Sequence, residues 1–238
     1  MSPKSSSPNL GRWLIVVIYA LAMAWVEAAV VYYLRSHIDR IEPYQALPLP
    51  HAGGFGMAEF IREIATLVML LTVGMLAGKT WRARAGFTLL AFGVWDIFYH
   101  VFLKVMCGWS NSLLDWDILF LVPLPWWRPV LAPALVSVLM IAWGTLASQS
   151  EPPVSKPTNW KVWLLNLTGV GLALYVFMAE ALRVAGGGVG ALRHLLPEQF
   201  NWPMFLIALA LMSAPVVRLL LLLRPNKPPL PAMQTVAD

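Results

Sequence analysis

Six long apolar stretches alternate with shorter polar segments along the chain. Each stretch holds about twenty residues with few charges, which is the length a helix needs to cross ~30 Å of hydrocarbon. The stretches occupy residues 12–34, 59–78, 86–106, 129–148, 161–182 and 203–223. The pattern therefore predicts an all-α fold, a polytopic membrane bundle of six transmembrane helices.

A shorter apolar stretch, residues 118–125, contains two prolines and is too short to span. Tryptophans flank it on both sides, at Trp109, Trp116, Trp126 and Trp127. We expect the region near 110–127 to be a short interfacial or re-entrant segment. Asp115 and Asp117 within it are expected in a hydrated loop at the outer interface, with calcium binding as the alternative.

The segments between the apolar stretches suggest the domain organisation. The predicted parts are a disordered tail (1–11), a four-helix membrane part (12–148), a cytoplasmic linker rich in proline (149–160), a two-helix membrane part (161–224) and a second disordered tail (225–238). The first apolar stretch could also be a cleaved signal peptide, because Lys4 and Arg12 precede its apolar core. A retained span is favoured, because the hydrophobicity continues well past the candidate cleavage site at Ala22.

Composition supports the membrane class. The chain is 59% hydrophobic and only 12% charged, whereas about a quarter of the residues in a soluble domain are charged. The single cysteine, Cys107, excludes an intrachain disulfide and a thiolate metal site. The net charge of +5 comes from bases that flank apolar stretches, so nucleic acid is not an expected partner.

Basic residues also predict the orientation. Lys79, Arg82 and Arg84 lie in one short loop, and loops rich in Lys and Arg stay on the cytoplasmic side. We therefore expect a multi-pass protein of the inner (plasma) membrane with the N-terminus and the C-terminus cytoplasmic.

Several ionisable residues fall inside the predicted helices, where such residues usually face a bundle interior or a cavity. A rise of about 1.5 Å per residue places Glu27, Glu63 and His100 at one depth below the outer surface. Four polar residues on the third helix follow steps of three and four and so share a face. These are Asp96, Tyr99, His100 and Lys104. We expect the helices to enclose an intramembrane carboxylate/histidine pocket that opens outward.

One hypothesis is a divalent metal site (Zn, Mn or Fe), since carboxylate and imidazole ligands from facing helices suit these metals. Its candidate ligands are Glu27, Glu63, Asp96 and His100. Such a metal would activate water or oxygen against an apolar substrate, with Asp96, His100 and Glu63 as candidate catalytic residues. The sequence shows no established enzyme motif, so whether the protein is an enzyme stays open at this point.

Other interpretations fit the same residues. The charges could be structural ion pairs or could contact a ligand, and the candidates are Glu27, Arg62, Tyr99, Lys104, Glu180 and Arg183. The acids could titrate in a proton- or ion-coupled carrier. The chain could also be a non-catalytic subunit of a larger membrane complex. The expected partners are the lipid bilayer, a lipid or apolar small molecule, and other membrane proteins.

Overall fold

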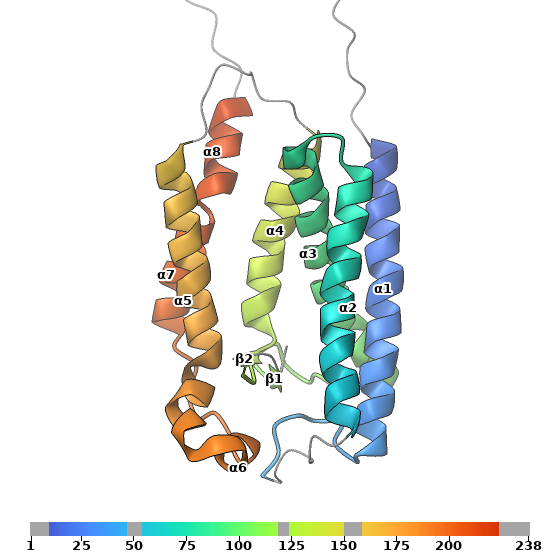
Figure 1. Cartoon of the computed structure of the whole chain (residues 1–238), viewed down its shortest axis with the longest axis vertical. Coiled ribbons are helices and arrows are strands. Elements are labelled where there is room, and N and C mark those ends of the chain that lie inside the picture. Colours follow the sequence, from blue (N-terminus) through green and yellow to red (C-terminus); the bar gives the residue numbers. More distant parts are fainter. Residues whose placement is uncertain (1–9, 47–53, 119–123, 150–158, 224–238) are drawn as a thin grey trace, which may run out of the picture.

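A computed structural model describes residues 10–46, 54–118, 124–149 and 159–223. Within these ranges the chain is almost entirely helical (Figure 1). The helices are α1 (Leu10–His37), α2 (Gly54–Ala77), α3 (Trp81–Cys107), α4 (Leu131–Gln149), α5 (Trp160–Val184), the short 3₁₀ turn η1 (Ala185–Gly187), α6 (Gly188–Arg193), α7 (Trp202–Met212) and α8 (Ala214–Leu223). Two short strands, β1 (Trp116–Ile118) and β2 (Trp127–Pro129), precede α4.

Six helical segments in the described ranges are long and apolar enough to cross a membrane. Each corresponds to one of the predicted stretches, which confirms the count. The fifth continues beyond α5 as far as Arg193, and the sixth consists of α7 and α8 together. The predicted tails and linker lie almost wholly outside the described residues. Helix α1 begins and α8 ends at the same end of the bundle (Figure 1).

Helix α3 is the centre of the first helix group and packs against α1, α2 and α4. Small residues bring α3 and α4 close together. A Cβ atom added to Gly144 would lie 2.5 Å from the carbonyl oxygen of Gly86, and one added to Gly93 would lie 2.7 Å from the carbonyl oxygen of Ser137. Without side chains at these positions, the two backbones approach each other as in tightly packed membrane helices.

Helices α5, α7 and α8 form a second group, with α4 between them and α1–α3 (Figure 1). Gly169 of α5 lies against the backbone of α7, because a Cβ atom there would be 2.7 Å from the Ala208 carbonyl oxygen. The group meets α4 through a buried apolar cluster of Ala132, Val176, Phe177 and Phe205.

The sixth span is interrupted between α7 and α8. Pro215 has no backbone N–H to donate, so it cannot continue the helical hydrogen-bond ladder. The Nδ2 atom of Asn166 on α5 donates to the Met212 carbonyl oxygen at 3.2 Å. A side chain from the neighbouring helix thus satisfies the last carbonyl of α7 at the break.

The strands β1 and β2 pair antiparallel, with Asp117 opposite Arg128. The expected interfacial segment therefore contains two paired strands. Residues 119–123, between β1 and β2, lie outside the described part of the chain. Asp117 is completely buried, so the expected hydrated loop is wrong for this residue. Asp115 does lie in a turn, where its Oδ2 atom accepts hydrogen bonds from the backbone N–H groups of Asn111 and Ser112.

Candidate functional site

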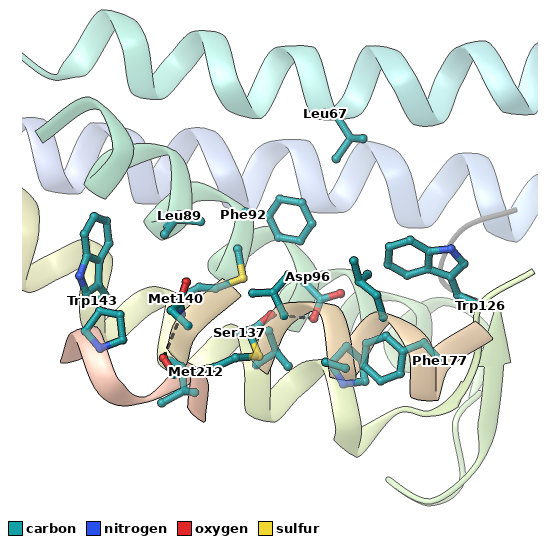
Figure 2. A pocket seen from close by; sticks show the side chains of 18 of the residues that line it. Leu67, Leu89, Phe92, Asp96, Trp126, Ser137, Met140, Trp143, Phe177 and Met212 are labelled. Atoms are coloured by element: carbon teal, nitrogen blue, oxygen red, sulfur yellow. Dashed lines mark hydrogen bonds between the residues drawn. The ribbon is translucent and has the colours of Figure 1, made fainter. Parts of the chain in front are cut away.

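A cavity of about 470 Å³ lies between the two helix groups (Figure 2). Its walls come from α2, α3, α4, α5, α7 and α8, together with Trp126 just before β2. They are almost entirely apolar and aromatic, and the polar residues among them are Glu63, Ser137, Asn166 and Asp96. This volume falls in the range of small-molecule pockets, about 300–1,000 Å³, which typically combine apolar walls with a few polar groups.

Asp96 is the most deeply buried acid that lines the cavity, at 1% exposure. The Oγ atom of Ser137 on α4 donates to Asp96 Oδ2 at 2.8 Å (Figure 2). The other carboxylate oxygen, Oδ1, is buried and has no hydrogen-bond partner among the described residues. Leaving such an atom unsatisfied costs free energy, so this oxygen is where a ligand could donate a hydrogen bond.

A second polar group joins α1 to α2. Glu27 on α1 is buried and accepts from Arg62 and Thr66 of α2. Arg62 also binds Glu59, with 2.8 Å between its Nε and Glu59 Oε2. One guanidinium thus bridges two carboxylates. The pair Glu27–Arg62 is one of the ion pairs that the sequence suggested.

A third polar group surrounds Asp117. Arg35, near the end of α1, donates to Asp117 Oδ1 at 2.7 Å, and its guanidinium carbon lies 4.6 Å from the centre of the Trp109 ring. His100 approaches the other carboxylate oxygen with Nε2 at 3.4 Å, while its Nδ1 lies 2.9 Å from the Asp96 carbonyl oxygen. Burial raises the pKa of Asp117, but the charge of Arg35 and the imidazole of His100 outweigh it and hold this pKa well below its usual range.

Arg128 lies beside the same carboxylate. Residues directly opposite each other in an antiparallel pair project to the same side of the sheet, and Arg128 is opposite Asp117. It is completely buried, and its guanidinium nitrogens make no hydrogen bond with any residue that the structure describes. Burial lowers the pKa of Arg128, while the negative charges of Asp117 and Asp96 oppose that shift. Asp117 therefore lies between two buried bases.

The structure separates the predicted site residues into several places. Glu63 and Asp96 line the cavity. Tyr99 is buried, and its ring meets the His100 ring edge to face at 5.0 Å. Lys104 is exposed at the end of α3 and donates to the Gly108 carbonyl oxygen at 2.7 Å.

The remaining predicted pair, Glu180 and Arg183, forms an ion pair at 2.6 Å on the more exposed side of α5.

The polar face expected on α3, from Asp96 to Lys104, points into the bundle only as far as His100, because Lys104 is exposed.

The four candidate metal ligands do not form one group. Glu27 faces Arg62 and Thr66, whereas His100 faces Asp117. No three His, Cys, Asp or Glu side chains in the described residues lie close enough together to hold a metal ion. The four side chains therefore do not converge in the described part of the chain, because residues at one depth face different neighbours around their helices.

Seven residues of these polar groups were absent from the sequence-based site: Arg35, Glu59, Thr66, Asp117, Arg128, Ser137 and Asn166. Ser137 and Asn166 could have been found as polar residues within apolar helices. Asp117 and Arg128 carried a weaker signal, namely opposite charges next to tryptophans on the two sides of the short apolar stretch.

Comparisons with protein-family models, with curated proteins and with solved structures gave no match. The fold and the cavity alone therefore define the class: a helical bundle whose six apolar segments are long enough to span a membrane.

Proposed function

We propose that this chain is a multi-pass protein of the inner membrane that binds a small, mainly apolar molecule in the cavity between its two helix groups. Both chain ends lie on the cytoplasmic side in this proposal. The orientation is supported by Lys79, Arg82 and Arg84, because the turn between α2 and α3 is at the same end of the bundle as the start of α1 (Figure 1).

The observation that carries the proposal is the cavity itself, with Asp96 in its wall. The cavity holds about 470 Å³, which is within the usual volume of small-molecule pockets. Its aromatic and aliphatic walls favour a molecule taken from the bilayer, and the unpartnered oxygen of Asp96 supplies a polar contact that fixes its orientation.

The experiment measures binding of the neutral fluorophore N-phenyl-1-naphthylamine to the full chain in phosphatidylcholine nanodiscs, with empty nanodiscs subtracted. The wild-type chain is expected to show a saturable component. Ala173→Trp and Met140→Trp place an indole at the cavity wall and should weaken this component about tenfold or more, because overfilling a cavity excludes its ligand.

Leu167→Trp is the matched control, since Leu167 lies on α5 like Ala173 but is 64% exposed and does not line the cavity. Its saturable binding should equal that of the wild type. Equal binding by the control and both filled variants would show that the cavity is not the binding site. Absence of saturable binding to the wild-type chain would show that the cavity does not hold this neutral molecule.

A further inference from the structure

The charges along the cavity wall indicate which kind of ligand the cavity takes. This inference rests on the proposed function. Two carboxylates, Glu63 and Asp96, line the cavity, and no Lys, Arg or His is among the described residues of its wall. Both acids are buried, at 4% and 1% exposure. A buried carboxylate is costly unless a positive charge or hydrogen-bond donors compensate it.

Arginines balance acids in the two polar groups that adjoin the cavity. The acids in the cavity wall and in the two adjoining polar groups are Glu27, Glu59, Glu63, Asp96 and Asp117, and the guanidinium groups are Arg35, Arg62 and Arg128. Arg62 is shared among Glu27, Glu59 and the nearby Glu63.

Asp96 is the acid best placed to hold a ligand. Ser137 satisfies one of its oxygens, and the other has no hydrogen-bond partner in the part of the chain that the structure describes. Arg128 is close enough to attract Asp96, but it shares its charge with Asp117, makes no hydrogen bond within the described ranges and does not line the cavity. A donor or cation arriving through the cavity would therefore meet an unsatisfied carboxylate oxygen.

The walls suit the apolar part of such a cation. Aromatic rings line the cavity from several elements, and they belong to Phe92, Trp126, Trp143, Trp163 and Phe177. The face of an aromatic ring attracts a cation within about 6 Å. Acids and aromatic faces in the same apolar cavity both favour positive charge over negative charge.

From these observations we propose that the cavity selects a lipophilic organic cation, such as a bulky amine or a quaternary ammonium or phosphonium ion. Asp96 is its main electrostatic partner, and Glu63 of α2 lines the same cavity. The apolar groups of the cation fill the space between α4 and α5, where aromatic rings surround them. Neutral molecules of similar size bind more weakly, and anions are disfavoured.

The test uses two probes of the same shape and opposite charge, tetraphenylphosphonium and tetraphenylborate. Direct binding of radiolabelled tetraphenylphosphonium to the full chain is measured in phosphatidylcholine nanodiscs. Each ion is also tested as a competitor of the neutral fluorophore. The two ions are compared at equal concentrations within the bilayer, measured from the amount of each ion that enters empty nanodiscs. The cation should compete about tenfold more strongly than the anion.

Asp96→Asn keeps the size of the side chain and its contact with Ser137 but removes the charge. This variant should lose most of the preference for the cation over the anion. Glu63→Gln is the second variant and should reduce the preference less. Asp39→Asn changes an exposed carboxylate and should leave the preference unchanged.

Equal competition by the two ions, stronger competition by the anion, or a preference that survives both cavity variants would overturn the inference while leaving the proposed binding cavity intact. Failure of the neutral fluorophore and of the cation to bind saturably would overturn both. If the cation binds and the neutral fluorophore does not, and if Asp96→Asn loses binding of the cation, the inference is supported and the ligands of the cavity are limited to cations.

Discussion

Replacing Asp117 with asparagine is expected to lower the free energy of unfolding by about 3–5 kcal/mol, the usual cost of leaving a buried charge without its partner. Asp117 is completely buried, lies 2.7 Å from Arg35 and faces Arg128 across the strand pair. Asparagine has the same shape but no charge. Two buried guanidinium groups would then lack their shared counter-charge.

The loss is measured by unfolding the purified full chain with SDS in mixed micelles. Asp39→Asn is the matched control, because Asp39 is exposed, and it should change the free energy of unfolding by no more than about 0.5 kcal/mol. If Asp117→Asn is as stable as the control, then Asp117 does not balance the buried bases and the account of this polar group is incorrect.

Replacing Gly144 with leucine is the second change with a large expected effect, a loss of about 3 kcal/mol in the free energy of unfolding. A Cβ atom at this position would lie 2.5 Å from the Gly86 carbonyl oxygen and 2.7 Å from the backbone nitrogen of Leu90. These are backbone atoms, which cannot rotate away as a side chain can. Helices α3 and α4 would have to separate, which would also move Asp96 away from Ser137.

Gly171→Leu is the matched control. Gly171 lies within helix α5, and a Cβ atom there would meet nothing within 4 Å. The control should unfold at nearly the same SDS concentration as the wild type and bind the neutral fluorophore normally. Equal stability of the two leucine variants would show that α3 and α4 do not pack at Gly144.

The fold was predictable from the sequence because membrane spans are a property of single helices. About twenty apolar residues suffice to identify a candidate span, and the described residues contain six helical segments long and apolar enough to cross a membrane. The interruption at Pro215 could also be expected, since proline lacks the N–H group that a helix needs. Its capping by Asn166 could not, because that contact depends on how α5 and α7 pack.

The site was only partly predictable, because depth along a helix says nothing about which neighbour a side chain faces. Glu63 and Asp96 do line one cavity, as their polar positions inside apolar helices suggested. Glu27 and His100 were expected beside them. In the structure Glu27 faces Arg62, and His100 faces Asp117.

The group around Asp117 shows why loop residues were the hardest to place. The sequence marks Asp117 and Arg128 as charges near a membrane surface, where hydrated side chains are common. Their burial follows from the pairing of β1 with β2, which places them opposite each other beneath the ends of the helices. Such pairing between two three-residue strands leaves almost no trace in hydrophobic periodicity.

The most direct test of the central claim, that the cavity binds an apolar small molecule, is photolabelling of the full chain in nanodiscs with a neutral, diazirine-bearing hydrophobic probe. We expect saturable labelling of Met140 and Met212, which line the cavity, and displacement of the label by excess unlabelled probe. Leu76, which is 82% exposed, should be labelled only in proportion to the probe concentration. Labelling confined to such outward-facing positions, with none at Met140 or Met212, would contradict the claim.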